Sequence, residues 1–223
     1  MAERTSPASF AVRAPAATLQ LAERQRALTE TLLRVAEIPE SAAPRVEEAL
    51  RALDALREAL APVALGDALP RLGPEPRTQR PYYLSGVITG AHHPLRPDLE
   101  IGHEAGVTRG SVTFGVTFEG PPGCVHGGFV AHFFDQILGQ HNLWAGIPAM
   151  TASLTVRYRR GTPILRTLGF EVTHEIAPGA ASETRKVITR SALVADGTLF
   201  SEAEGFFVVP KSAAWAPAPA QKR

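Results

Sequence analysis

The segment best suited to chemistry runs from residue 120 to residue 139 and has the sequence GPPGCVHGGFVAHFFDQILG. Gly127 and Gly128 stand where a helix is predicted to begin, and glycine lets a ligand approach the backbone closely. The first N–H groups of a helix have no intrahelical acceptor and lie at the positive end of the helix dipole. The amides of Gly127 and Gly128 are therefore candidates to hold a developing oxyanion.

Asp135 is the candidate carboxylate of the same predicted helix. It stands among Phe133, Phe134, Ile137 and Leu138, and a carboxylate in apolar surroundings is costly unless it is paired. Such a group could act as a general base or as a nucleophile. The periodicity alone is equally compatible with an aspartate that faces solvent from an amphipathic helix.

The histidines outside this loop give weaker signals. His92, His93 and His103 cluster in a segment predicted to be loop or short helix, residues 92–106. The cluster lacks the acid–histidine spacing of a known metal motif, so we predict no metal site there. His132 and His141 are nine residues apart, near opposite faces of a helix, which argues against a shared site.

The elements around this segment predict an α+β organisation. Apolar residues spaced by seven, four and three positions predict a helix from Thr18 to Ile38, and a second helix starts near Pro44 with Ser41 as its candidate cap. The two helices form a predicted helical hairpin, which we interpret as a packing or dimerisation appendage rather than a binding module. The predicted segments are a flexible tail at 1–17, the hairpin at 18–64, a linker at 65–81, a β-rich domain at 82–210 and a flexible tail at 211–223.

The β-rich domain is predicted to contain one strong helix, at residues 129–144. Alternating apolar and polar residues, separated by turns rich in Gly and Pro, predict the strands around it. A single helix among strands suits an antiparallel sheet with one face covered by that helix. Residues 195–197, Ala-Asp-Gly, supply a predicted hairpin turn. The predicted strands are residues 82–89, 111–118, 151–159, 165–175, 184–194 and 199–209.

Composition limits the classes of function. Of the 223 residues, 44% are apolar, which is enough for a real core. The net charge of +1 creates no global field for nucleic acid or an anionic membrane, so we expect neither as a partner. Without an apolar run of about 18 residues or a secretory signal, the chain is predicted to be cytoplasmic. Cys124, the single cysteine, excludes an intrachain disulfide and is expected to be a packed thiol.

The 120–139 segment, followed by MTASLTVRYRR at residues 150–160, resembles the hotdog-fold acyl-CoA thioesterases and is most similar to their PaaI-like branch. The matching features are the GPPGxVHGG loop, an aspartate nine residues after the histidine, and a threonine sixteen residues after that aspartate. The resemblance spans roughly residues 82–209 and does not include the hairpin. It implies an antiparallel sheet wrapped around a central helix, and hydrolysis of an acyl-CoA thioester without a metal or redox cofactor.

The resemblance also assigns roles to particular residues. It implies that Asp135 is the catalytic carboxylate, either as a general base toward water or as a nucleophile that forms an anhydride. Gly127 would supply the oxyanion amide, with Gly128 beside it. His126 would orient the loop or contact the thioester, and Thr151 would position the attacking water.

Two positions depart from the family pattern. Gly120 stands where some relatives carry an asparagine six residues before the histidine, so a side-chain contact to the thioester is absent there. Gly161 stands where relatives often have proline, which we expect to alter only a turn.

The phosphates of coenzyme A call for a local basic patch, because the chain is nearly neutral overall. Arg157 and Arg159 lie two residues apart on one predicted strand and therefore share a face. The planar fork of arginine binds phosphate oxygens bidentately, although solvated charges at a strand end are the alternative explanation. We also predict substrate contacts for Phe129 and Phe133.

The spacing of Gly127 and Asp135 predicts a composite site. Eight residues separate them by about 12 Å along one helix, whereas an oxyanion donor and a water-activating group must each lie within about 3 Å of their reacting atoms. Antiparallel helices of two subunits satisfy both distances, so we expect a homodimer, or a dimer of dimers, with two sites per dimer. Thr151 lies on the polar parity of its strand, so it reaches Asp135 only if the strand starts irregularly or that face meets the interface.

Two other functions remain open at this point. One is a non-catalytic dimer that binds acyl-CoA or another hydrophobic ligand and whose hairpin recruits a partner. The other is hydration of an enoyl thioester, although the acid–histidine pairing expected for it is not evident. Asp135 discriminates between hydrolysis and binding, because a binder does not need the carboxylate.

Overall fold

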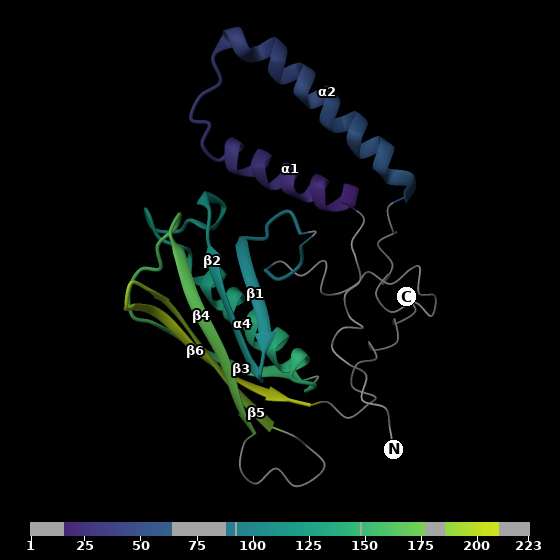
Figure 1. The fold of residues 1–223 in the computed structure, drawn as a ribbon. Coiled ribbons are helices and arrows are strands. Elements are labelled where there is room, and N and C mark those ends of the chain that lie inside the picture. The colour runs from purple at the N-terminus through teal and green to yellow at the C-terminus, as the bar shows by residue number, and fades with distance from the viewer. Residues whose placement is uncertain (1–15, 64–87, 92, 148, 177–185, 210–223) are drawn as a thin grey trace, which may run out of the picture.

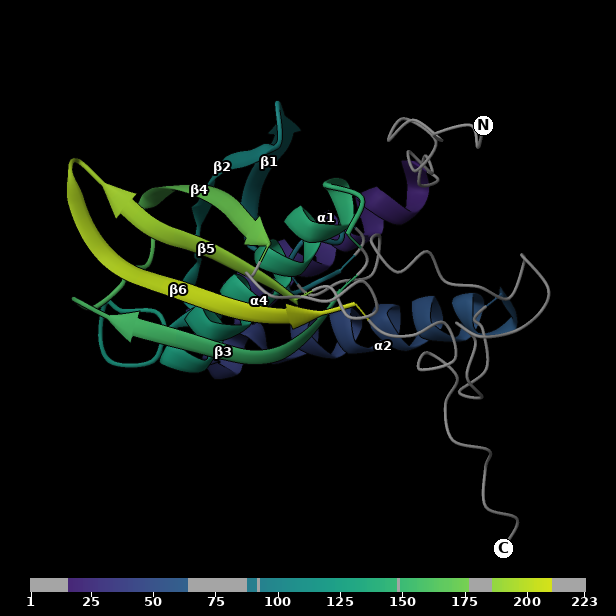
Figure 2. The ribbon, with the colours of Figure 1, turned by 90° about the horizontal axis from the view of Figure 1, so that it is seen from below.

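A six-stranded antiparallel sheet curves around one helix in the computed structural model, which describes residues 16–63, 88–91, 93–147, 149–176 and 186–209 (Figures 1 and 2). The helix is α4 (Gly127–Trp144), and the strand order in the sheet is β1-β2-β4-β5-β6-β3. This arrangement confirms the predicted α+β hotdog fold. The strands are β1 (Asp98–Glu104), β2 (Val107–Thr113), β3 (Met150–Tyr158), β4 (Thr167–Ile176), β5 (Lys186–Ala195) and β6 (Thr198–Val208).

The first hairpin differs from its prediction. Residues 98–104, predicted to be loop or short helix, form β1, and the strand predicted at 111–118 begins earlier and ends at Thr113. Ala105 and Gly106 join β1 to β2 with φ angles of 49° and 77°, a left-handed turn that closes a tight hairpin. Of the strand predicted at 82–89, residues 82–87 lie outside the described residues, and Ile88 and Thr89 lie in a turn.

The later strands agree with the predicted strands to within about two residues. The turn predicted at 195–197 is confirmed, because Ala195 pairs with Thr198 while Asp196 and Gly197 have φ angles of 47° and 71°. Positive φ at both central residues is the geometry whose twist matches the flanking strands.

The core lies between α4 and the concave face of the sheet. Phe133 of α4 is fully buried, with its ring 5.5 Å from the Phe114 ring and 5.4 Å from the Phe170 ring, both in edge-to-face contact. Such aromatic contacts add to the stabilisation from apolar burial, by about 0.5–1.5 kcal/mol for each pair. The buried side of α4 comprises Val130, Phe133, Phe134, Ile137, Leu138, His141 and Asn142.

Two N-terminal helices, α1 (Ala16–Leu32) and α2 (Ala43–Leu60), precede the sheet domain. In Figure 1, α1 lies across one end of the sheet and α2 lies beyond it. The first helix ends six residues before the predicted Ile38, and Pro44 occupies the first turn of the second helix as predicted. The cap predicted at Ser41 is wrong, because Ala42 is the N-cap and no side chain caps the helix.

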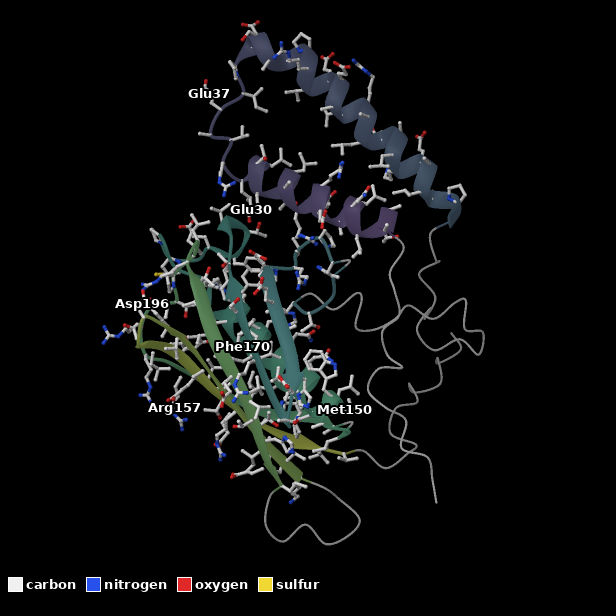
Figure 3. The ribbon with its side chains drawn as sticks, in the orientation of Figure 1. Glu30, Glu37, Met150, Arg157, Phe170 and Asp196 are labelled. Atoms are coloured by element: carbon white, nitrogen blue, oxygen red, sulfur yellow. The ribbon has the colours of Figure 1, made fainter. Side chains whose placement is uncertain are left out.

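Glu30 fastens α1 to the sheet domain. Its carboxylate accepts hydrogen bonds from the Val116 amide at 3.2 Å and from the amide and hydroxyl of Thr117 at 3.2 and 2.7 Å. Figure 3 shows Glu30 on the side of α1 that is turned towards the sheet. Both partners lie in η5 (Val116–Phe118), a short 3-10 helix just upstream of the 120–126 loop. The N-terminal helix therefore supports the segment that leads into the candidate site.

Candidate functional site

The loop that enters α4 is held by backbone hydrogen bonds. The Gly120 amide donates to the Cys124 carbonyl at 2.8 Å, and the His126 amide donates to the Phe118 carbonyl at 2.8 Å. These bonds join the residues before the loop to those after it. They therefore fix the position of His126, the residue just before α4.

Both departures from the family pattern have a structural reason. A Cβ atom at Gly120 would lie 2.7 Å from the Cα atom of His126, so the loop leaves no room for an asparagine there. A Cβ atom at Gly161 would lie 2.7 Å from the sulfur of Cys124. The loop is therefore packed around two glycines, at one of which a backbone atom approaches too closely for any side chain.

The first turn of α4 distinguishes the two glycine amides. The Gly128 amide donates to Nδ1 of His126, the N-cap residue, at 3.1 Å. The Gly127 amide has no acceptor among the residues that the structure describes. Within the described residues, Gly128 therefore has a partner for its amide and Gly127 has none, as the oxyanion role predicted for Gly127 requires.

Tyr158 is a residue of this turn that the sequence prediction missed. Its hydroxyl donates to the Gly127 carbonyl at 2.8 Å, from the far end of β3. The Gly127 carbonyl and the Gly128 amide belong to one peptide group, so Tyr158 and His126 bind its two ends. A neutral His126 that accepts at Nδ1 carries its proton on Nε2, which makes Nε2 a donor. The sequence signal was present, since Tyr158 lies on the inward parity of its strand.

Asp135 and Thr151 are brought together. The Thr151 hydroxyl donates to Oδ1 of Asp135 at 2.8 Å. The register of β3 against β6 shifts between Thr151 and Ser153, a bulge that turns Thr151 to the side of α4. The sequence pattern required either an irregular strand start or an interface on that face for this contact, and β3 does start irregularly.

Two predicted aromatic contacts have different environments. Phe129 is half-buried, and its ring packs edge-to-face on Phe118 and on His126 at centroid distances of 5.2 and 6.2 Å. Phe129 therefore lies beside the first turn of α4, with part of its surface accessible. Phe133 is fully buried in the core, so it offers no surface to a ligand in this structure.

Arg157 and Arg159 lie on the outer face of the sheet. Tyr158 between them points to α4, so alternation turns both arginines away from the helix. Figure 3 shows Arg157 projecting outward. Arg159 forms an ion pair with Glu202 at 2.6 Å, whereas Arg157 forms none within the described part of the chain.

A histidine network that the sequence prediction missed lies near the other end of α4. His141, with no exposed surface, contacts the Thr108 hydroxyl through Nδ1 at 2.9 Å and Nδ1 of His174 through Nε2 at 2.7 Å. The Thr108 hydroxyl also contacts His103 at 2.8 Å. Burial, and then the nearby His174 and His103, lower the pKa of His141 to about 4. The spacing of His132 and His141 gave no sign of these partners, because they come from three different strands.

In the described ranges, no group of three or more acidic, histidine or cysteine side chains is arranged to hold a metal ion. No helix in those ranges is long and apolar enough to cross a membrane.

The fold is similar to that of solved thioesterase superfamily proteins. A crystal structure of one thioesterase superfamily protein matches with a TM-score of 0.67 and 29% identity, over 86% of this chain and 95% of that chain. The sheet and α4 occupy only about half of this chain, so the similarity extends into the N-terminal residues. No family model matches the chain.

Two further structures have lower scores. A hypothetical thioesterase with coenzyme A from Streptococcus pneumoniae matches at 17% identity and a TM-score of 0.43, over 51% of this chain and 86% of that chain. The PaaI protein of the phenylacetic acid degradation operon of E. coli matches at 14% identity and a TM-score of 0.42, over 49% of this chain and 81% of that chain.

Proposed function

We propose that this hotdog-fold chain, whose structure resembles the thioesterase superfamily, hydrolyses an acyl-CoA thioester to a free acid and a thiol. The observation that carries the proposal is the hydrogen bond from Thr151 to Asp135 on the unburied side of α4. A carboxylate at that place has no role in the core. Its position on the helix also matches the spacing from His126 that the sequence resemblance requires.

Asp135 is the proposed activating group. Thr151 donates to Oδ1, which leaves Oδ2 to accept a proton from water or to attack the thioester carbonyl. In the water route, the hydroxyl oxygen of Thr151 retains lone pairs that can accept a hydrogen bond from the same water molecule. Thr151 therefore orients the carboxylate and the water together. Both routes, general base and anhydride, remain open.

The Gly127 amide is the proposed oxyanion donor. It lies at the N-terminus of an 18-residue helix, where the helix dipole favours negative charge, and it has no acceptor in the described part of the chain. His126, held through Nδ1, would donate from Nε2 to the substrate. A preorganised donor of this kind contributes roughly 10²–10³-fold to the rate of acyl transfer.

The two halves of the site are proposed to come from two subunits. Gly127 and Asp135 are about 12 Å apart along α4, too far to serve one carbonyl. β3 forms one edge of the sheet, and seven of its nine residues are exposed, so a second copy can approach at this edge. A twofold axis there would place the Gly127 turn of one subunit near Asp135 and Thr151 of the other.

A hydrolysis screen tests the proposal. The full chain is incubated with aromatic, short-chain and long-chain acyl-CoAs, and release of free thiol is monitored. We expect turnover of at least one class, and loss of that turnover in Asp135→Asn. Binding of acyl-CoA without thiol release by the wild-type chain would instead support the non-catalytic binder.

A further inference from the structure

We propose that the cleft between α1 and the sheet domain binds an organic carboxylate with a small apolar body. The cleft has a volume of about 350 Å³ and lies between α1, the segment before β1, and η5. Its walls combine two arginines with apolar surface, including Arg26, Arg96, Leu95, Pro97 and Phe118. Nothing in the proposed hydrolysis uses this cleft.

The two guanidinium groups have unused donors. Arg26 donates through Nη1 to the His93 carbonyl at 3.0 Å, and Arg96 donates through Nη2 to the Leu99 carbonyl. Nε of Arg96 is buried and has no acceptor within the described ranges. An arginine carries five N–H donors, so within the described ranges each of these side chains has several without an acceptor. The guanidinium donors that lack an acceptor within the described residues favour a ligand that accepts hydrogen bonds.

The two arginines of the cleft, Arg26 and Arg96, also lack ion-pair partners within the described residues. Burial and the nearby Arg26 charge lower the pKa of Arg96, and Asp98 opposes that shift. A guanidinium nevertheless stays protonated in proteins. Glu30 lines the cleft too, but its oxygens are bound by η5 and by Arg34. With the charge of Glu30 paired to Arg34, Arg26 and Arg96 are left with the single carboxylate of Asp98, so one positive charge is in excess and an added anion would balance it.

The apolar residues that line the cleft favour an organic anion. Leu95, which is 37% exposed, and the exposed Pro94 beside it offer a surface for hydrocarbon rather than for a hydrated polyphosphate. The volume is at the lower end of the range for small-molecule sites. A carboxylate is planar and fits the guanidinium fork bidentately. These features together favour a short-chain or aryl carboxylate.

Phe118 links the cleft to the loop before α4. Its carbonyl accepts the His126 amide at 2.8 Å, and its ring packs on Phe129. Because Phe118 is also part of the cleft lining, a ligand in the cleft would lie next to the segment that holds the loop before Gly127. The acid product of a thioester hydrolysis belongs to the proposed ligand class, but the binding proposal does not depend on that activity.

Calorimetric titration of the full chain tests the cleft, with hexanoate, its neutral analogue hexanamide, and inorganic phosphate as probes. We expect hexanoate to bind at millimolar concentration and hexanamide at least tenfold more weakly, because hydrogen bonds to a charged partner are the stronger ones. Arg96→Gln and Arg26→Gln should each weaken hexanoate binding at least tenfold. Arg24→Gln, an exposed neighbour on α1, is the matched control and should have no effect.

Several outcomes would overturn the proposal. These are no hexanoate binding, equal binding of hexanoate and hexanamide, or tighter binding of phosphate than of hexanoate. Two arginine variants on different elements guard against a misfolded protein, which circular dichroism detects. Asp135→Asn should leave hexanoate binding unchanged. Loss of binding in that variant would place the acid in the proposed hydrolytic site and would also overturn the cleft assignment.

Discussion

The Thr151 hydroxyl donates a hydrogen bond to the Asp135 carboxylate at 2.8 Å, across the gap between an edge strand and the central helix. Simple alternation along β3 would point Thr151 away from α4, because Leu154, Val156 and Tyr158 occupy the inward parity. The bulge between Thr151 and Ser153 reverses the parity at the start of the strand. Bulges are frequent next to active sites, where they redirect one side chain without disturbing the rest of the sheet.

Replacing Thr151 by valine tests whether this hydrogen bond matters for catalysis. Valine keeps the branched shape but lacks the hydroxyl, so the carboxylate and the water lose a shared partner. We expect kcat to fall by roughly 10–100-fold, the usual cost of a lost hydrogen bond to a charged group, with a much smaller change in KM. Thr155→Val is the control and should retain full activity, because Thr155 lies beyond the bulge and its side chain points away from α4. Equal activity of the two variants would remove Thr151 from the mechanism.

Asp135→Asn removes the proposed base or nucleophile while keeping the size of the side chain. The amide cannot take up a proton from water or form an anhydride. Hydrolysis should fall by at least the roughly 10²–10⁴-fold that positioned proton transfer contributes. Steady-state thiol release and far-UV circular dichroism measure activity and folding on the same samples. Asp54→Asn, exposed on α2, is the matched control. Wild-type turnover by a folded Asp135→Asn chain would contradict the assignment.

Patterns within short segments of the sequence were sufficient to predict much of this fold. The alternation of β4, β5 and β6 and the apolar run of α4 lie within single segments, so the sequence predicts them closely. β1 was missed because Leu99 and Ile101 are its only two apolar residues and because histidines and two prolines precede it. The Tyr158–Gly127 bond and the His141 network join residues more than 30 positions apart, and no linear pattern records such contacts.

The buried His141 should make the protein less stable in acid. Its pKa is lowered from 6.5 to about 4 in the folded state, so the unfolded state binds more protons between those values. Stability is therefore lost as pH falls below 6.5. The groups that face His141 are Thr108, His103 and His174, and none is an acid that could compensate its charge. We expect a loss of roughly 2 kcal/mol between pH 7 and pH 4.5 from this residue.

Urea unfolding at a series of pH values measures that loss. His141→Gln should be less stable than the wild type at pH 7, because the network loses a member. Its stability should nevertheless depend less on pH between 6.5 and 4.5. The same pH slope in both proteins would show that His141 does not govern the acid transition.

Of the two arginines predicted to bind the phosphates of coenzyme A, we expect Arg157 to contribute more. Arg159 is bound to Glu202, whereas Arg157 has no ion pair within the described ranges. Arg157→Gln should raise KM for acyl-CoA and leave KM for a truncated thioester without the nucleotide unchanged. Arg159→Gln should have the smaller effect. If both variants behave as wild type on acyl-CoA, the phosphates are held elsewhere, and Arg109 or the Arg185–Lys186 pair would be tested next.

Mixed dimers test whether Gly127 and Asp135 serve one site from two subunits. Gly127→Pro removes the amide hydrogen at the first helical position, where proline is tolerated. The nearest atoms to an added Cβ there are those of the Tyr158 ring at 3.5 Å, an ordinary contact, so a Cβ atom fits at this position. Gly127→Ala makes the same contact but keeps the amide, and should remain active.

Gly127→Pro and Asp135→Asn chains should each be inactive alone. A heterodimer of the two contains one site with both groups intact and one site with neither. Mixing under conditions that exchange subunits should therefore restore activity, up to about one quarter of the wild-type rate for random pairing, since half of the dimers then carry one intact site of two. Native mass spectrometry measures the heterodimer fraction. Inactive mixtures that contain heterodimers would mean that each chain builds its own site, and the 12 Å separation along α4 would then need another oxyanion donor near Asp135.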